Sequence, residues 1–499
     1  MKAISFKNRL PNPAIFLVPP MAVTTFLWIT SPNPVTLIQA LAAFIILAMP
    51  WTTYWKWRKV RQTEVPLFSL IGGIYWVYYA FPLFWGDRYS VSVFKQGQAV
   101  SEEAITIAIV MAVLGVVCFW AGMKVAIGKR FVPRSVPDIP SNPLHWDWLR
   151  ILLIGCAVAS LFEEWFYAVS SDSVIQFLVT FLTLVPMVCY AILLRAFLRG
   201  KSTFIDNVLI VAFLVLRAIT GLASGWLGAF AFVMITTAVV FIYERKRFPL
   251  LLFAVIVVYF MFFQVGKFRI RERFGTNDSQ DSKVEHVNAW VNESAKIWKE
   301  ALTDPKGEAM QQAIYMSLSR TSLLTQTANI VELTPAVVPY QNGQTYSYLF
   351  VALIPRFIWP DKPSANDANR FYQTAYGITD EDSLSSGSFA SGSLAEAYIN
   401  FGWPGIIVLM FLIGVFCDWF QWTFLCEKSG FLMRGIGVAL IPYLLSIEGQ
   451  LAIYVGATMQ RVFLILILMI PIVRFRRFDQ HPEPLDDAGR MVLNAGPIS

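Results

Sequence analysis

The chain has 499 residues, of which 56% are hydrophobic and only 15% are charged. Soluble domains carry about 25% charged residues, so this composition excludes a soluble enzyme and indicates a membrane protein. The formal net charge is +7, but most Lys and Arg residues lie in short clusters between apolar runs. Such clusters are typical of cytoplasmic loops in membrane proteins. We therefore expect no nucleic-acid partner.

Apolar runs divide the chain into about twelve segments, nine in the first half and three after a long polar interval. They lie near 14–30, 35–53, 66–85, 103–122, 149–168, 174–197, 205–221, 225–243, 249–265, 397–420, 433–454 and 460–475. Because lipid admits only helices and closed barrels, runs of this length are helical. The sequence therefore predicts an all-α polytopic membrane protein with about twelve transmembrane helices.

The basic clusters predict which ends of these helices face the cytoplasm. They follow the second, fourth, sixth, eighth and twelfth segments, at 56–61, 124–134, 195–201, 245–247 and 474–477. All five lie on one side together with the N-terminus, which the positive-inside rule assigns to the cytoplasm. The first segment follows Lys2, Lys7 and Arg9 but lacks a small-residue cleavage site, so we expect an uncleaved helix rather than a signal peptide.

This topology predicts four regions. Residues 1–265 form N-terminal transmembrane helices, 266–396 a large periplasmic loop, 397–476 C-terminal transmembrane helices, and 477–499 a disordered cytoplasmic tail. Within the loop we predict a polar helix near 283–300 and an amphipathic one over 310–333. The segment 346–359 (YSYLFVALIPRFIW) is too short to span the bilayer and fits a re-entrant or interfacial position.

Several ionisable residues are candidates for function because charge inside a membrane is costly. Arg217 and Glu448 lie in the outer halves of predicted spans, and Arg461 opens the last one. Either Glu448 pairs with one of these arginines as a structural bridge, or they converge on a charged cavity at the outer face. The loop adds four cations on the side where positive charge is scarce: Lys267, Arg269, Arg271 and Arg273. They form either an anion-binding surface or part of a long translocated loop that the charge rule does not govern.

A cationic site at headgroup depth suits a polyisoprenyl diphosphate. Arginine binds phosphate oxygens bidentately and keeps its charge when partly buried, and fixed cations stabilise a departing diphosphate. The sequence contains no phosphate-binding glycine loop of the Walker type. The cysteines and the three histidines form no metal-binding pattern, and we interpret the acidic run 380–382 as a solvated face of a Ser/Gly loop. We therefore expect no metal and no cofactor.

Two motifs extend this interpretation. The stretch IPRFIWPDKP at 354–363, a Gly/Ser-rich loop and GSLAEAYINFGWPG at 392–405 resemble the Wzy-type oligosaccharide repeat-unit polymerases of bacterial O-antigen and exopolysaccharide synthesis. The resemblance implies a GT-C-like, metal-independent, inverting glycosyltransferase in the bacterial inner membrane, with both termini cytoplasmic. It would transfer the growing chain from undecaprenyl diphosphate to an incoming lipid-linked repeat unit. The implied partners are this donor and acceptor, membrane lipids, a chain-length-determining co-polymerase and a flippase.

The resemblance also assigns roles to residues. Inverting transfer needs a base for the acceptor hydroxyl, for which Glu396 is the first candidate and Glu448 the second, while Tyr398 and Asn400 would orient a sugar. The diphosphate would be bound by Arg217, Lys267, Arg269, Arg271, Arg273, Arg320, Arg356, Lys362 and Arg461. Two alternatives stay open: Glu396 stabilises a helix N-terminus through the helix dipole, and Lys362 is an exposed turn residue.

Two other functions remain. An O-antigen ligase uses the same donor with a different acceptor, and the residues alone do not separate it from a polymerase. A flippase or transporter of the lipid-linked oligosaccharide often shows internal repeats and a site at the bilayer midplane. The charges of this chain gather at the outer face, and its two halves are unlike each other, which favours the transferase.

Overall fold

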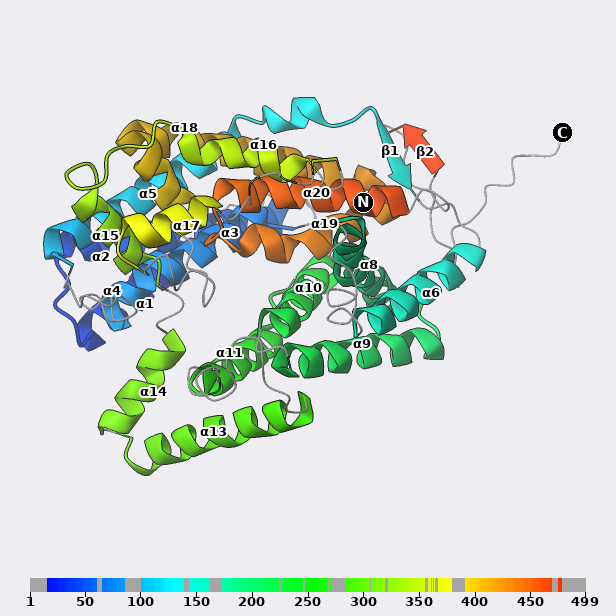
Figure 1. Ribbon diagram of the computed structural model, residues 1–499, viewed down its shortest axis with the longest axis horizontal. Helices are drawn as coiled ribbons and strands as arrows, with labels where there is room; N and C mark the ends of the chain where they lie inside the picture. Colours follow the sequence, from blue (N-terminus) through cyan, green and yellow to red (C-terminus); the bar gives the residue numbers. More distant parts are fainter. Residues whose placement is uncertain are drawn as a thin grey trace, which may run out of the picture.

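The computed structural model is built almost entirely of helices (Figure 1). The residues it describes are 16–60, 65–85, 100–138, 143–161, 173–223, 227–245, 247–267, 270, 283–305, 307–318, 322–354, 358–359, 361, 363, 367–378, 391–468 and 474–477. Within them, six helices are long and apolar enough to cross a membrane, and five shorter apolar helices accompany them. The prediction of a helical membrane protein is confirmed, whereas twelve spans remain a prediction.

The helices follow the predicted segments closely in the first half of the chain. They are α1 (Val18–Thr30), α2 (Leu37–Val60), α3 (Leu67–Tyr75), the π-helix η2 (Trp76–Ala80), α4 (Phe81–Trp85), α5 (Glu102–Lys124), α6 (Pro143–Ser160), α8 (Ser173–Leu198), α9 (Phe204–Ala223), α10 (Gly228–Arg245) and α11 (Leu250–Gln264). A 3-10 turn, η3 (Gly128–Phe131), and a strand, β1 (Ser135–Asp138), follow α5.

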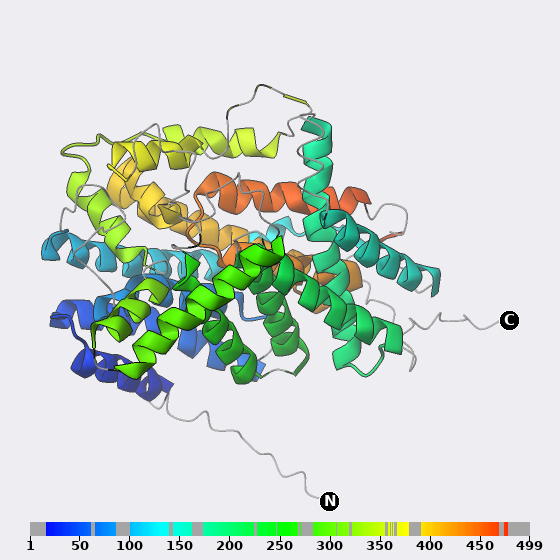
Figure 2. The same cartoon turned by 60° about the horizontal axis from the view of Figure 1, so that its bottom comes forward.

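In the described part of the predicted outer loop, the helical elements are α13 (Lys283–Thr303), α14 (Glu308–Leu318), α15 (Leu324–Leu333), the 3-10 turn η5 (Gln344–Tyr346), α16 (Ser347–Leu353) and α17 (Asp367–Ala375). The polar helix near 283–300 is confirmed as α13. It packs on α9 and α11 and crosses the outside of the bundle (Figure 2). The single helix expected over 310–333 is wrong, because α14 ends at Leu318 and α15 begins at Leu324.

The C-terminal part comprises α18 (Gly392–Phe424), η7 (Glu427–Ser429), α19 (Gly430–Leu445), the π-helix η8 (Ala452–Ala457), α20 (Thr458–Leu468) and the strand β2 (Arg474–Arg477). α16 packs against η8 and α20 and runs alongside α20 (Figure 1). Both positions predicted for 346–359, re-entrant and interfacial, stay predictions.

Three boundaries differ from the prediction. α18 begins at Gly392 rather than 397, which places Glu396 inside a helix. α19 ends at Leu445, and residues 446–450 form a turn, so Glu448 lies in a turn rather than in a span. The last apolar helix ends at Leu468, and 474–477 is a strand that pairs with β1. The fold is therefore not purely α, because these two distant polar segments satisfy each other's backbone hydrogen bonds.

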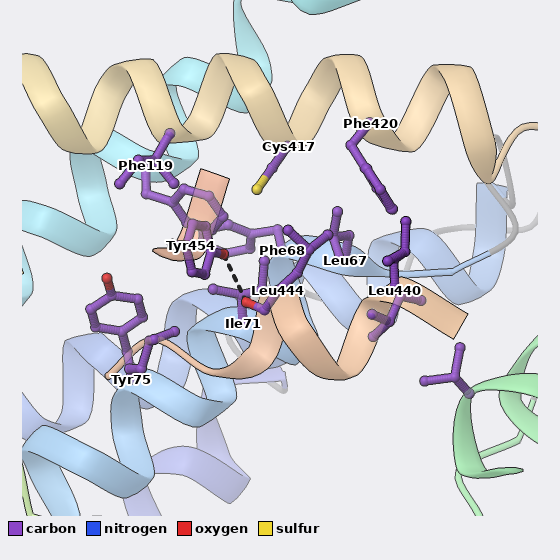
Figure 3. Packing of buried hydrophobic residues seen from close by; sticks show 14 of the residues in the cluster. Leu67, Phe68, Ile71, Tyr75, Phe119, Cys417, Phe420, Leu440, Leu444 and Tyr454 are labelled. Carbon is purple, nitrogen blue, oxygen red and sulfur yellow. Dashed lines mark hydrogen bonds between the residues drawn. The ribbon is translucent and has the colours of Figure 1, made fainter. Parts of the chain in front are cut away.

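The centre of the bundle is the contact between α5 and α18. A Cβ atom added to Gly414 would lie 2.2 Å from the carbonyl oxygen of Phe119, and one added to Gly122 would lie 2.1 Å from that of Phe411. Glycines thus let the two backbones touch, as small residues do between membrane helices. Beside this contact, Phe119 and Cys417 pack with α3 and α19, and the Tyr454 hydroxyl donates to the Leu444 carbonyl at 2.7 Å (Figure 3).

Contacts at one end of the bundle, which we call the strand end, join loops that the charge pattern placed on one side. β1 pairs antiparallel with β2, with Ser135 opposite Arg477. The Asp138 carboxylate accepts hydrogen bonds from the backbone N–H groups of Phe431 (2.8 Å) and Leu432 (3.3 Å) and so caps α19. The predicted cytoplasmic loops 124–134 and 474–477 therefore meet here.

The opposite end joins loops predicted to be exoplasmic. The Ser31 hydroxyl donates to the Phe84 carbonyl at 3.0 Å. The backbone N–H of Leu323, in the predicted outer loop, donates to the Tyr78 carbonyl at 3.0 Å. These contacts group the loops into the two sets that the sequence predicts, while the assignment of one set to the cytoplasm stays a prediction.

Candidate functional site

The first nine residues of α18, 392–400, lie at the opposite end and are all buried, whereas Phe401 after them is exposed. Two glycines shape this segment. Gly392 has φ +78°, and a Cβ atom there would lie 3.1 Å from the Ile447 carbonyl oxygen. Gly402 has φ 62° and ψ −145° inside the helix, a conformation open mainly to glycine. The first nine residues of the motif, GSLAEAYIN, thus fold as a short buried helix that is offset from the rest of α18.

Glu396 is the centre of a hydrogen-bonded group that we call the α18 junction: Thr345, Glu396, Asn400 and the turn 446–451. Its side chain is 1% exposed. One carboxylate oxygen accepts from the Thr345 hydroxyl at 2.8 Å, and the other accepts from the Leu451 backbone N–H at 2.6 Å. A buried carboxylate is tolerated when donors satisfy it in this way. Glu396 therefore ties α18 to two other segments.

Asn400 lies one helical turn after Glu396 and completes the group. Its amide nitrogen donates to the Thr345 hydroxyl oxygen at 2.7 Å and to the Glu396 carbonyl at 2.8 Å. Its amide oxygen accepts from the Gly343 backbone N–H at 2.9 Å. Because Thr345 accepts from Asn400, its own proton points at Glu396. The orientation of each polar group in the junction is thereby set.

The turn 446–451 brings the second predicted carboxylate to the same place. Ser393 donates to the Gly449 carbonyl at 2.8 Å, which adds to the bond between Leu451 and Glu396. Glu448 lies at the exposed tip of this turn. The two candidate bases therefore come together from α18 and from the turn after α19, one buried and one exposed to the medium.

Aromatic rings surround Tyr398 beside the junction. Its ring contacts those of Tyr340 and Trp403 at centroid distances of 6.1 and 6.4 Å, both edge-on. Tyr398 is buried, whereas Trp403 is 39% exposed. Burial, together with the nearby charge of Glu396, raises the pKa of the Tyr346 hydroxyl above its usual range. This edge of the junction can present aromatic faces and protonated phenols to a ligand.

Three of the predicted cations, Arg217, Lys267 and Arg461, lie within the described residues. The Arg461 guanidinium lies over the Tyr443 ring at 4.0 Å, a cation–π contact. Arg217 lies over the Phe213 ring at 5.9 Å on α9, which packs with α6, α8, α10 and α13. Lys267 follows Gly266, which abuts Ser294 of α13. The structure thus brings together Glu396, Tyr398, Asn400 and Glu448, while Arg217 and Lys267 belong to a separate group of helices beside α13.

The remaining six predicted cations lie outside the described residues: Arg269, Arg271, Arg273, Arg320, Arg356 and Lys362. The acidic run 380–382 lies there too. Among the residues that the structure does describe, no group of three or more His, Cys, Asp or Glu side chains is placed to hold a metal ion.

Two features of the structure were not predicted from the sequence. Thr345 follows an Asn-Gly turn at 342–343, a signal for a tight connection, but nothing local indicates that its hydroxyl reaches Glu396. At the strand end, Arg195 contacts Glu244 at 2.5 Å, and Arg434 donates to the Tyr243 hydroxyl at 2.8 Å. The signal for this buried group was Arg434 itself, a charge inside an apolar helix.

Comparison with known proteins places the chain in a family. No curated protein matches it, and no solved structure matches it. Residues 79–440 match the model of a family described as "Domain of unknown function (DUF8712)". The matched region includes Thr345, Glu396 and Asn400 and ends before Glu448. Since it covers well over half of the chain, this protein belongs to the DUF8712 family.

Proposed function

We propose that this protein is a membrane glycosyltransferase that joins polyprenyl-diphosphate-linked oligosaccharide repeat units, with its reaction centre at the α18 junction. The observation that carries the proposal is the pairing of a buried, fully hydrogen-bonded carboxylate, Glu396, with an exposed one, Glu448, at one end of an apolar helical bundle. The second of the two motifs that resemble repeat-unit polymerases contributes Glu396 and Asn400 to this junction.

The geometry supports different roles for the carboxylates of Glu396 and Glu448. Both oxygens of Glu396 are occupied by donors from the protein, so its role is to hold the turn 446–451. Glu448, at the exposed tip of that turn, is the carboxylate that an acceptor hydroxyl can reach. Glu448 is therefore our candidate base, which reverses the order of preference given by the sequence alone.

The reaction is a single displacement. The acceptor hydroxyl oxygen bonds to the anomeric carbon of the donor sugar while the bond from that carbon to the diphosphate oxygen breaks. The hydroxyl proton passes to Glu448, and the electron pair leaves with the diphosphate. A positioned base contributes about 10²–10⁴-fold to such a step, and cations stabilise the departing charge. Arg320, Arg356 and Lys362 remain the proposed cations for that purpose.

The experiment that tests this function uses the purified chain in lipid nanodiscs with a defined undecaprenyl-diphosphate-linked repeat unit, with and without EDTA. A ladder of products that persists in EDTA is the expected result. A single addition to a lipid A core acceptor, without a ladder, would instead identify a ligase. Labelled lipid that crosses a liposome bilayer without any product would identify a transporter and contradict the proposal.

Variants connect the activity to the junction. Glu448→Gln should lower the rate of ladder formation by about 10²–10⁴-fold, the range that a general base supplies, in protein that remains folded. Glu332→Gln is the matched control, because Glu332 is an exposed carboxylate on α15; it should keep full activity. Equal activity of both variants would remove Glu448 from the mechanism.

A further inference from the structure

α17 has two chemically different faces. Its outer face carries the pair Asp367 and Arg370, 3.4 Å apart, with the Arg370 side chain 59% exposed. Its inner face carries Asn369, Tyr372 and Gln373, whose exposures are 0%, 0% and 1%. Helices normally turn apolar side chains inward. An inner face of amides and a phenol therefore needs an explanation.

Two polar atoms on this face have no hydrogen-bond partner among the described residues. They are the Tyr372 hydroxyl and Oε1 of Gln373. A buried polar atom without a hydrogen bond retains its desolvation cost, so native proteins keep few of them. Because both side chains lie on the same buried face of α17, they indicate a place where a polar ligand supplies the missing bonds.

The contacts of α17 show which residues surround this place. The Tyr376 hydroxyl and the Thr334 hydroxyl are 2.6 Å apart, and Asn329 of α15 donates to the Tyr376 carbonyl at 3.4 Å. The rings of Tyr372 and Tyr376 are 5.5 Å apart. Tyr79 of η2, which accepts from Thr327 at 3.4 Å, lies close enough to Tyr372 to affect its ionisation. We call Tyr79, Thr327, Tyr372 and Gln373 the α17 seat.

The α17 seat is uncharged and adjoins the α18 junction. Burial raises the pKa of the Tyr376 hydroxyl to about 12, and neighbouring Tyr340 adds to this rise. Tyr340 in turn contacts Tyr398 of α18. A row of protonated phenols thus leads from the seat to the junction. Such groups both donate and accept hydrogen bonds, and so do amides, but neither compensates a phosphate charge.

We propose that the α17 seat is a subsite for an uncharged, hydroxyl-rich ligand, namely a sugar residue. Hydroxyl groups of a sugar can form the missing hydrogen bonds with Tyr372 and Gln373, and tyrosine rings offer apolar faces to its C–H groups. The assignment of this sugar to the acceptor repeat unit rests on the proposed function, whereas the ligand class follows from the side chains alone. Because the seat is buried, a sugar enters when α17 separates from α15 and the bonds of Tyr376 to Thr334 and Asn329 break.

The test measures saturation-transfer NMR between the full-length protein in nanodiscs and the methyl glycosides of glucose, galactose and N-acetylglucosamine. We expect transfer to at least one of them. Tyr372→Phe and Gln373→Met should each reduce it at least fivefold and leave the unfolding midpoint equal or higher, because each change removes a buried atom that lacks a partner. A merely structural role would leave the transfer unchanged.

Tyr259→Phe is the matched control. The Tyr259 hydroxyl, on α11, is also buried and has no hydrogen-bond partner among the described residues. Its removal should raise the unfolding midpoint without changing saturation transfer. No transfer to any glycoside, or equal transfer in all three variants, would overturn the subsite.

The outcomes separate the subsite from the proposed function. Glycoside binding that depends on Tyr372 and Gln373, without ladder formation, would support the subsite and contradict only the polymerase. If Tyr372→Phe and Gln373→Met both leave ladder formation unchanged, the subsite is contradicted and the proposed polymerase function is not.

Discussion

The backbone N–H of Leu451 donates a 2.6 Å hydrogen bond to the carboxylate of Glu396, 55 residues earlier in the chain. This bond closes the turn that carries Glu448 onto the first turns of α18. With the bond from Thr345 to the other carboxylate oxygen, it makes Glu396 the point where three segments of the chain meet. The arrangement of the candidate site therefore depends on one buried side chain.

Glu396→Gln should destabilise the protein. The amide has one acceptor oxygen, so either Leu451 or Thr345 loses its bond to Glu396. A hydrogen bond to a charged group contributes about 1.5–3 kcal/mol, and we expect the free energy of unfolding to fall by about 2 kcal/mol. Thr345→Val should cost a similar amount, whereas Thr345→Ser should not. Denaturant unfolding in detergent measures the free energy of unfolding of each variant. If the loss in the double variant Glu396→Gln/Thr345→Val equals the sum of the two single losses, the two side chains do not interact, and the role given to their hydrogen bond is contradicted.

Gly402→Ala should destabilise α18 at its offset. The residue has φ 62° and ψ −145°, and a Cβ atom would lie 3.0 Å from the Tyr340 hydroxyl. Strain of this kind costs about 1–3 kcal/mol. Gly200→Ala is the control, because Gly200 also has positive φ but no atom within 4 Å of the added Cβ. A thermal-shift assay should show a larger decrease in melting temperature for Gly402→Ala than for Gly200→Ala. Equal decreases would show that the contact with the Tyr340 hydroxyl adds nothing to the strain.

Gly414→Ala should loosen the contact between α5 and α18. The added methyl group would lie 2.2 Å from the Phe119 carbonyl oxygen, which is backbone and cannot rotate away. Overpacking costs about 1–3 kcal/mol. Gly155→Ala, in α6 with nothing within 4 Å of the added Cβ, should be neutral or stabilising by up to about 1 kcal/mol. Unfolding midpoints compare the two variants, and a neutral Gly414→Ala would mean that the helices do not touch there.

Glu244→Gln should destabilise the strand end strongly. The carboxylate contacts Arg195 at 2.5 Å and Arg199 at 2.8 Å, and the Arg195 and Glu244 side chains are 7% and 10% exposed. Removing one member of a buried ion pair costs about 3–5 kcal/mol. Arg370→Gln breaks an exposed pair and should cost less than about 1 kcal/mol. Denaturant unfolding measures the loss of free energy of unfolding in each variant. Similar losses in the two variants would show that Glu244 is solvated.

Cysteine labelling tests the predicted orientation. Ser135 at the strand end and Ser347 near the α18 junction are both exposed. A membrane-impermeant maleimide should label Ser347→Cys in intact spheroplasts and Ser135→Cys only after lysis. The unmodified chain, whose described cysteines are buried or half-buried, sets the background. The reverse pattern would invert the topology and place the junction on the cytoplasmic side.

The sequence by itself determined the class of protein, the positions of most helices and the grouping of loops at two ends. Each of these follows from local properties, because hydropathy sets where a chain enters lipid and basic clusters mark one side of it. The motif 392–405 and the residues Glu396, Tyr398 and Asn400 were also visible as sequence, since their spacing places them on one short helix.

Only the tertiary structure decided how those residues are used. Glu396 is buried because its partners, Thr345 and Leu451, come from segments 51 and 55 residues away. Glu448 is exposed because α19 ends three residues before it, and β1 and β2 are strands because they pair with each other. Hydrogen bonds between distant segments leave no periodic pattern in the sequence. They nevertheless decide which of the two carboxylates is buried and which one is exposed.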